Sequence, residues 1–410
     1  MTKKILLFLL MISSFILIFY KFNFIPQYLA FDELEFAKLA LSLKDQSYTP
    51  YSPLATGHST LYFYLILFFF NIFGVNNFAL RLPSALSGIG SVFVFYLIIK
   101  IIFKKEKKLF FRELFPVILA FIFLTLRWFF NFARFAFEAP FLLLLELISI
   151  YFLFNYFENK KTFNLFLSGI FSGLAFNSYT PGRLFFVLPL GFLIFNFIKN
   201  KKIILLKNIL FFIIPLFILT LPLNLYLLKN QDDRIDKLFF WRNHEMTLKE
   251  KFDGTIQNIN NLFLMLFLKG DINGKHNYPG KPALNPIIFV LFLIGLFYFL
   301  KKERKKLFGW FFLGYFFISL APSIPIYPWE NPNMLRTYTL IPSIVFFTGQ
   351  GIIFLINQFK NKKLLISIFI LVFISSIYEI RTYFKYQSQV FKEAFEIKYP
   401  LEKIIYEKNY

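Results

Sequence analysis

Residues 5–33 read ILLFLLMISSFILIFYKFNFIPQYLAFDE. From Ile5 to Tyr20 this stretch is nearly all apolar, and it reaches the acidic pair Asp32-Glu33 after a short, more polar gap. An apolar segment of this length is typical of a helix that crosses a membrane, where few charges are tolerated. Carboxylates at the mouth of a bundle of such helices are therefore the strongest candidates for chemistry in this chain.

The composition of the whole chain is that of an integral membrane protein. Of its 410 residues 57% are hydrophobic, 65 are Phe, and the mean hydropathy is +0.59, which excludes an ordinary soluble domain. The net charge is +22, but Lys and Arg fall in short clusters between apolar runs, as in membrane loops, so no nucleic-acid partner is expected. The chain has no cysteine, which excludes disulfides and thiolate metal sites.

About eleven apolar runs are long enough, or nearly long enough, to span a membrane. Because no small-residue cleavage site follows the first run, we interpret it as an uncleaved span. The fold class is therefore an all-α polytopic bundle. The runs cover residues 4–25, 78–103, 114–131, 139–157, 163–178, 183–198, 203–228, 284–300, 307–322, 337–357 and 364–378.

Residues 58–73 are also apolar, and their sequence leaves open whether they span or lie at the outer interface. An interfacial segment leaves the N-terminus and five basic clusters in the cytoplasm, whereas a spanning segment moves every cluster outside. The positive-inside rule favours the interfacial arrangement. The five clusters are Lys104–Lys108, Lys160-Lys161, Lys199–Lys202, Lys301–Lys306 and Lys360–Lys363.

This topology divides the chain into a membrane domain, residues 1–378, and an extracytoplasmic tail, residues 379–410. The first outer loop, 26–77, contains an amphipathic helix over 33–44 that would lie on the membrane surface. Its apolar stripe is Phe36, Leu39, Ala40 and Leu43. The long outer loop, 229–283, has a further helix candidate at 255–268 and a length that suits a cap over a site.

Asp32 has two available roles. A carboxylate at this place can take a proton from an attacking hydroxyl group or hold a divalent cation. Alternatively, Asp32-x-x-Glu35 is a capping box for the surface helix. The neighbouring Glu33 is not needed for such a cap, which favours chemistry for the pair.

Arginines near the outer ends of the spans are candidates for binding phosphate through two parallel hydrogen bonds. Arg81 has this position, although it could also extend to the lipid headgroups. Arg127, Arg134 and Glu138 form a second group. Arg127 and the deeper Glu146 lie inside apolar runs, where a buried structural pair is as plausible as a catalytic role.

Two outer segments have the composition of rigid turns. Gly270–Gly280 contains Lys275-His276, which suits contact with an anionic or sugar substrate but is weak support for a metal site. Tyr327–Arg336 contains Trp329, which is either a stacking face for a sugar or an interfacial anchor. No phosphate-binding loop, nucleotide fingerprint, serine elbow or HExxH motif occurs, so ATP-driven transport and hydrolase chemistry have no support.

Several motifs resemble those of membrane glycosyltransferases of the dolichyl-phosphate-mannose protein mannosyltransferase and aminoarabinose transferase type, which have the GT-C fold. The resemblance covers most of the chain to about residue 355, and its most specific parts are the acidic pair and the string from Ala79 to Leu86. The motifs are Phe31-Asp32-Glu33, His58-Ser59-Thr60-Leu61-Tyr62, Phe73-Gly74, Ala79-Leu80-Arg81-Leu82-Pro83-Ser84-Ala85-Leu86, Phe132–Glu138, Gly169–Ala175, Gly270–Gly280 and Arg336–Gly351. Two departures are Ser-Thr after His58, where many members have Pro-Pro, and Lys275-His276, where relatives often have Arg-His.

The resemblance implies a catalytic role for Asp32 with Glu33 beside it, and an arginine, Arg81, near the lipid phosphate. The expected substrate-binding residues are His58, Arg81, Arg134, Glu138, Tyr179, Arg183, Lys275, His276 and Arg336. No cofactor is certain; a divalent cation, Mg or Mn, would be held by Asp32, Glu33 and Glu138.

The implied reaction is an inverting transfer of one sugar from a polyprenyl-phosphate donor to a lipid, glycan or protein acceptor. It would take place on the extracytoplasmic face of the cell membrane, among membrane lipids. Two alternatives from other classes are a carrier or flippase for lipid-linked glycans, and a catalytically inactive partner of a related transferase. A carrier predicts two pseudo-symmetric halves and no special acid in the first loop.

Overall fold

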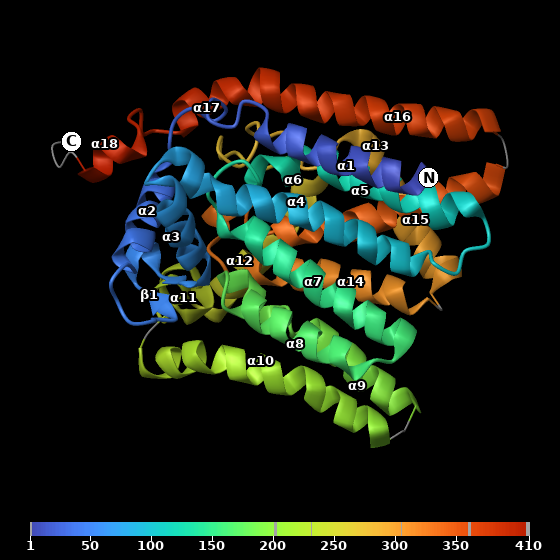
Figure 1. Ribbon diagram of the computed structural model, residues 1–410, viewed down its shortest axis with the longest axis horizontal. Coiled ribbons are helices and arrows are strands. Elements are labelled where there is room, and N and C mark those ends of the chain that lie inside the picture. Colours follow the sequence, from blue (N-terminus) through green and yellow to red (C-terminus); the bar gives the residue numbers. More distant parts are fainter. Residues whose placement is uncertain (1, 201–202, 231, 305, 360–361, 407–410) are drawn as a thin grey trace.

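The computed structural model describes residues 2–200, 203–230, 232–304, 306–359 and 362–406, which form a bundle of helices (Figure 1). Of the predicted basic clusters, Lys201, Lys202, Lys305 and Lys360 lie outside these residues. In the described part of the chain, each predicted span contains a helix. These helices are α1 (Thr2–Phe19), α4 (Asn77–Ile102), α5 (Phe115–Thr125), α7 (Glu138–Asn159), α8 (Thr162–Phe176), α9 (Val187–Asn200), α10 (Ile203–Lys229), α13 (Pro286–Tyr298), α14 (Leu307–Leu320), α15 (Ile341–Phe359) and α16 (Lys362–Arg381).

Other elements connect these helices. The remaining α-helices are α2 (Phe31–Ser42), α3 (Leu61–Phe73), α6 (Arg127–Phe132), α11 (Asp233–Leu238), α12 (Leu248–Phe267), α17 (Ser388–Ala394) and α18 (Leu401–Tyr406). The 3-10 or π turns are η1 (Leu54–Thr56), η2 (Phe110–Leu114), η3 (Thr180–Leu184), η4 (Phe240–Arg242), η5 (Phe299–Glu303), η6 (Ala321–Ser323), η7 (Pro328–Glu330), η8 (Tyr338–Leu340) and η9 (Thr382–Gln387). Strands β1 (Tyr51–Ser52) and β2 (His58–Ser59) pair antiparallel, with Tyr51 opposite Ser59.

Six helical stretches among the described residues are long and apolar enough to cross a membrane. Shorter apolar helices accompany them, so the prediction of an all-α polytopic membrane protein is confirmed. The six stretches are Asn77–Ile102, Glu138–Asn159, Thr180–Lys199, Leu206–Lys229, Tyr338–Phe359 and Ile366–Ala394.

The segment whose topology the sequence left open forms α3, which does not carry the chain across the bundle. Arg81, near the start of α4, donates to the carbonyl oxygens of Pro26 and Tyr28, which follow α1. The end of α1 and the start of α4 therefore lie at the same end of the bundle, where Figure 1 also shows α2 and α3. With 13 residues, α3 is about 20 Å long, shorter than a bilayer core of about 30 Å.

The opposite end of the bundle is basic. Lys105, after α4, lies 2.9 Å from Glu158 near the end of α7. One cavity is lined by Lys105, Glu106, Glu303 and Lys306, so the clusters that follow α4 and α13 meet there. We call these two ends the basic end and the loop end; the loop end contains the first outer loop and the long outer loop.

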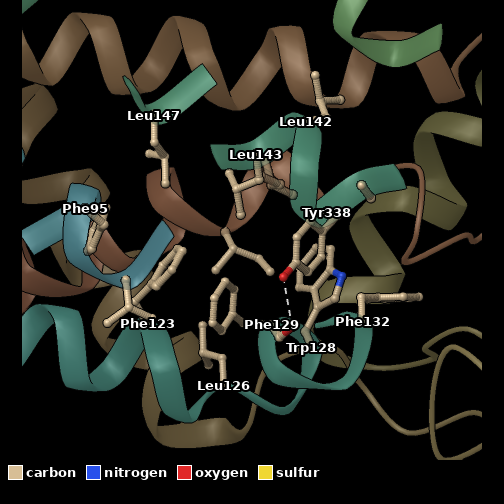
Figure 2. Close-up of a cluster of buried hydrophobic side chains, with 14 of the residues drawn as sticks. Phe95, Phe123, Leu126, Trp128, Phe129, Phe132, Leu142, Leu143, Leu147 and Tyr338 are labelled. Carbon is tan, nitrogen blue, oxygen red and sulfur yellow. Dashed lines mark hydrogen bonds between the residues drawn. The ribbon is translucent and has the colours of Figure 1, made fainter. Parts of the chain in front are cut away.

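The core holds an aromatic cluster that joins the middle of the chain to its C-terminal third. Figure 2 shows Trp128, Phe129 and Phe132 packed against Tyr338, whose hydroxyl donates to the carbonyl oxygen of Phe129 at 2.9 Å. The predicted span 114–131 is not one helix, because Leu126 has extended backbone (φ −63°, ψ 121°) between α5 and α6. The chain changes direction at this break, so that α6 lies in the loop end.

Three further boundaries differ from the prediction. Helix α2 begins at Phe31 rather than within 33–44, although the predicted stripe, from Phe36 to Leu43, is buried. Helix α12 begins at Leu248 rather than 255, because Thr247 and Glu250 form a capping box. The boundary placed after residue 378 falls inside α16, and the tail returns to the loop end, where Ile397 pairs with Leu29.

Candidate active site

The acidic pair divides into one buried and one accessible carboxylate. Glu33 is fully buried; its carboxylate accepts two hydrogen bonds of 2.8 Å from Arg81, one from the backbone N–H of Ala136 at 2.9 Å and one from that of Ala30 at 3.1 Å. Glu33, rather than the predicted Glu35, thus makes the capping contact with the backbone before α2. With both oxygens engaged, Glu33 holds the first outer loop to α4 and to the start of α7.

Arg81 and Arg134 are both occupied by protein acceptors. Arg81 binds Glu33 and two carbonyl groups, as described above, and lines none of the cavities described below. Arg134 donates to the carbonyl oxygens of Leu17, Ile18, Tyr20 and Ile25 and to the hydroxyl of Tyr383, at 2.6–3.0 Å. It therefore satisfies free carbonyls at the C-terminus of α1. In this geometry both guanidinium groups serve structural contacts within the protein.

Asp32 keeps an accessible carboxylate because it points away from this network. Its side chain is 46% exposed and accepts a hydrogen bond of 2.8 Å from the ammonium group of Lys275, which is 13% exposed. The structure thus brings together two predicted site residues that lie far apart in the sequence. Because the Asp32 carboxylate stays open to solvent, an acceptor hydroxyl can reach it, as a general base requires.

The turn that carries Lys275 is itself rigid. The Asp271 carboxylate lies 2.8 Å from Nδ1 of His276 and accepts a hydrogen bond from the backbone N–H of Met334 at 2.9 Å. Asn131 donates to the carbonyl oxygens of Lys275 and His276. These bonds fix the turn to α6 and to the segment before η8. Asp271 was not predicted as a site residue.

His58 and Glu138 form a buried pair close to a further arginine. Nδ1 of His58 lies 2.7 Å from the Glu138 carboxylate, and the exposures of the two side chains are 2% and 3%. Nη1 of Arg234 lies 2.7 Å from Nε2 of His58, and its guanidinium stacks over the Tyr179 ring, with a Cζ-to-centroid distance of 5.6 Å. Among the side chains that the structure describes, which exclude that of Asp233, no carboxylate lies within ion-pair distance of Arg234.

Three arginines line a cavity of about 180 Å³ at the loop end, which we call the arginine cavity. They are Arg183, Arg234 and Arg336, and Tyr179 lies beside them. The rest of the lining is almost wholly apolar: Thr180, Pro181, Leu184, Ile235, Leu238, Phe239, Ala321, Pro322, Pro325 and Ile326. Grouped guanidinium donors with adjacent apolar walls suit an anion attached to a hydrocarbon chain.

Two of these arginines are held by carboxylates. Arg183 pairs with Asp232, and Nη2 of Arg336 lies 2.7 Å from the Glu330 carboxylate. Burial alone would raise the pKa of Asp232, but the Arg183 guanidinium and hydrogen bonds outweigh it and keep this pKa below its ordinary value. Asp232 therefore stays ionised and fixes Arg183 at the rim of the cavity.

The structure thus gathers His58, Glu138, Tyr179, Arg183 and Arg336 around the arginine cavity. It places Asp32, on α2, against the turn that carries Lys275 and His276. Sequence reasoning missed Arg234, Asp232 and Glu330. The signal available for the first two was the charged run Asp232-Asp233-Arg234 in a loop whose length already indicated a cap over a site.

The predicted cation ligands do not meet. Glu33 is engaged by Arg81 and Glu138 by His58, so of the three only Asp32 keeps an accessible carboxylate. In the described ranges, no three His, Asp or Glu side chains gather as a metal site would require. The residues present therefore do not fit a cation held jointly by Asp32, Glu33 and Glu138.

Comparison with known proteins identifies the class of this fold. Residues 57–223 match the family model for dolichyl-phosphate-mannose-protein mannosyltransferase. The structure resembles ArnT from Cupriavidus metallidurans bound to undecaprenyl phosphate, with a TM-score of 0.59, 12% identity, and coverage of 95% of this chain and 76% of that one. No curated protein matches the sequence significantly.

A second similar structure is the archaeal oligosaccharyltransferase AglB from Archaeoglobus fulgidus, in complex with an inhibitory peptide and a dolichol-phosphate. The TM-score is 0.56 at 13% identity, and the alignment covers 97% of this chain but only 56% of AglB. The prediction of a GT-C fold, the fold of membrane glycosyltransferases, is confirmed.

Proposed function

We propose that this chain is an integral membrane glycosyltransferase that moves one sugar from a polyprenyl-phosphate donor to an acceptor, with inversion at the anomeric carbon. The observation that carries the proposal is the arginine cavity, which combines three guanidinium groups with apolar walls at the same end of the bundle as the accessible Asp32. The family match and the fold support the same class of reaction.

The lipid phosphate binds to the arginine cavity rather than to Arg81 or Arg134. Arg234 is the principal anion ligand, because it lines the cavity and pairs with none of the described carboxylates, a set that excludes Asp233. Arg183 and Arg336 are already paired, and they add positive charge at fixed positions. The isoprenoid chain lies along the apolar walls, near Leu184 and Phe239.

The transfer is a single displacement. Asp32 takes the proton from the acceptor hydroxyl or amine as that group attacks the anomeric carbon. The bond between this carbon and the phosphate oxygen breaks at the same time, and the phosphate leaves with the bonding electrons. Its growing negative charge is stabilised by the arginines, whose donors are preorganised. Lys275 keeps the Asp32 carboxylate in place.

The basic end faces the cytoplasm and the loop end faces outward, across the cell membrane. The lysine clusters at the basic end support this orientation through the positive-inside rule. The N-terminus is then cytoplasmic, and the tail, whose Ile397 pairs with Leu29, lies on the outer face with the active site. The acceptor is a lipid, glycan or protein on that face.

The test is consumption of a panel of polyprenyl-phosphate sugars by the reconstituted protein, supplied with host membranes as acceptors. The wild type is compared with Asp32→Asn at equal expression and equal thermal stability. Turnover of one donor by the wild type and its loss in the variant support the transferase. If the wild type turns over no donor but moves a labelled lipid-linked glycan across the bilayer, the protein is a carrier instead. If it does neither, the protein is a catalytically inactive partner of a related transferase.

A further inference from the structure

A second and larger cavity opens at the loop end and has a different chemistry. It encloses about 670 Å³, within the usual range of ligand sites, roughly 300–1,000 Å³. We call it the amide cavity, because side-chain amides dominate its polar lining. Its residues are Gln257, Asn261, Leu264, Lys269, Gly270, Asp271, Ile272, Asn273, His276, Pro328, Trp329, Glu330, Asn331, Pro332 and Asn333.

We propose that the amide cavity binds a sugar ring of one of the two substrates. Amide groups both donate and accept hydrogen bonds, which matches the hydroxyl groups of a sugar. Both carboxylates of the lining are paired, Asp271 with His276 and Glu330 with Arg336, and Lys269 is exposed at its edge. The cavity is therefore suited to an uncharged, hydroxyl-rich ligand rather than to a phosphate. This proposal deepens the proposed function and rests on it for the reaction.

Trp329 provides the stacking surface. Its side chain is 75% exposed, yet it is held in place, because it stacks on the Tyr327 ring with centroids 4.3 Å apart and planes at 19°. One face of the indole is thus covered and the other is free. An exposed aromatic face attracts the partly positive C–H groups of a pyranose ring.

Asn331 is left with an unmet hydrogen-bonding group at the same cavity. Its amide N–H donates to the carbonyl oxygen of Ser323 at 2.8 Å, but its buried Oδ1 has no hydrogen-bond partner in the described part of the chain. A buried polar atom without a partner is costly, so a ligand hydroxyl or a water at this place would be stabilising.

The cavity is preorganised and adjoins the arginine cavity. Asn258, on α12, donates to the carbonyl oxygens of Ile324 and Ile326, which fixes α12 to the segment before η7. Glu330 lines the amide cavity and Arg336 lines the arginine cavity, so their ion pair forms part of the wall between the two. A sugar in the amide cavity would therefore lie next to a phosphate in the arginine cavity.

The first test measures binding without turnover. The protein is placed in lipid nanodiscs free of glycoside detergents, which would themselves occupy the site. Methyl β-D-glucopyranoside and methyl α-D-mannopyranoside are added, and saturation transfer to their ring protons is recorded by NMR. We expect transfer in the wild type and in the matched control Trp310→Ala, which removes a 43% exposed Trp at the basic end. We expect about fivefold less saturation transfer in Trp329→Ala, which removes the stacking surface.

Equal transfer in Trp329→Ala and wild type, or none from either sugar to the wild type, would overturn the proposal. Gln257→Ala, on the exposed surface of α12, provides a second variant that should weaken transfer without affecting the fold. If Trp329→Ala instead lowers only the insertion of the protein into bilayers, Trp329 is an interfacial anchor and the proposal is wrong.

A second measurement identifies which substrate carries the sugar. In the turnover assay, a raised KM for acceptor alone in Trp329→Ala assigns the amide cavity to an acceptor saccharide, whereas a raised KM for donor alone assigns it to the donor sugar. The NMR result does not depend on turnover. Failure of the proposed transferase activity is therefore distinguishable from failure of the sugar site.

Discussion

The carboxylate of Glu33 and the guanidinium of Arg81 are joined by two hydrogen bonds of 2.8 Å in the interior of the protein, with side-chain exposures of 0% and 1%. This pair fixes the first outer loop to α4 beside Asp32, the residue proposed to act on substrate. The two adjacent acids therefore differ in their surroundings: Glu33 is buried and paired with Arg81, whereas Asp32 keeps an accessible carboxylate.

Removing one member of this pair should unfold the loop end. Arg81→Ala leaves the buried Glu33 carboxylate unpaired, which should cost about 3–5 kcal/mol of stability. Glu33→Gln should also lower the stability, but by less, because its amide still offers an oxygen to Arg81. Thermal denaturation in nanodiscs, with limited proteolysis of the loops, measures this. Arg81→Ala with full stability but a raised donor KM would instead show that Arg81 binds phosphate.

Asp32→Asn should abolish transfer without lowering stability. Loss of a general base lowers kcat by about 10²–10⁴-fold. The carboxamide keeps the size of the side chain, and Lys275 retains an oxygen acceptor. The pre-steady-state rate of donor consumption, measured at equal melting temperature, checks the prediction. Glu35→Gln is the matched control, because Glu35 is partly exposed on the same helix and pairs only with Lys38 among the described residues. Equal loss in both variants would argue against a specific base.

Arg134→Met should destabilise the protein and leave donor affinity unchanged in the molecules that remain folded. The variant strips four carbonyl groups near the end of α1 of their donors, and buried unsatisfied groups cost about 1–3 kcal/mol each. Arg112→Met, which changes a 45% exposed arginine at the basic end, should have little effect. Melting temperature and donor binding, measured on the same samples, separate the two roles. Weaker donor binding at an unchanged melting temperature would show that Arg134 binds the donor.

Arg234→Ala should weaken donor binding more than it weakens the fold. Hydrogen bonds to charged groups contribute about 1.5–3 kcal/mol, so the donor KM should rise by roughly 10–100-fold. Because the contact is ionic, the effect should shrink at high salt. Equilibrium binding of an unhydrolysed polyprenyl phosphate at two salt concentrations is the measurement, with Arg112→Ala as the control. A salt-independent loss would indicate that Arg234 acts only by holding His58 and Tyr179.

The free energy of unfolding should rise with pH between about 8 and 10. Burial lowers the pKa of Lys281 to about 8; the Glu379 carboxylate opposes this shift and Arg127 adds to it. An unfolded lysine titrates near 10.4, so the unfolded state binds more protons in this window and stability increases with pH. The gain should be about 1 kcal/mol, since Lys281 is partly exposed and solvent screens it. Melting temperature is followed across the window. Lys281→Met should flatten the slope, and the exposed Lys44→Met should not; a slope unchanged in Lys281→Met would contradict the assignment.

The sequence by itself determined the class of this protein, because hydropathy is a local property. Apolar runs must become helices in a membrane, where backbone groups find partners only within the segment. The positions of the helices, the acidic pair at the end of the first span, and the resemblance to GT-C transferases all followed from short stretches read in isolation. The break at Leu126 did not, since the run around it is apolar apart from Thr125, Arg127 and Asn131 and has no Gly or Pro from Val117 to Phe132 to signal a turn.

Only the tertiary structure decided which polar residues are free to act. Whether an arginine binds substrate depends on what else it touches, and those partners are distant in sequence: Arg134 is occupied by the end of α1, and Arg81 by Glu33. Lys275 reaches Asp32 from 243 residues away, and Arg234 reaches His58 from 176. A buried charge must be paired, and packing of the whole chain chooses its partner. For this reason the proposed phosphate ligands are Arg183, Arg234 and Arg336 of the arginine cavity rather than Arg81 and Arg134. Of these three, Arg234 was not indicated by the motifs.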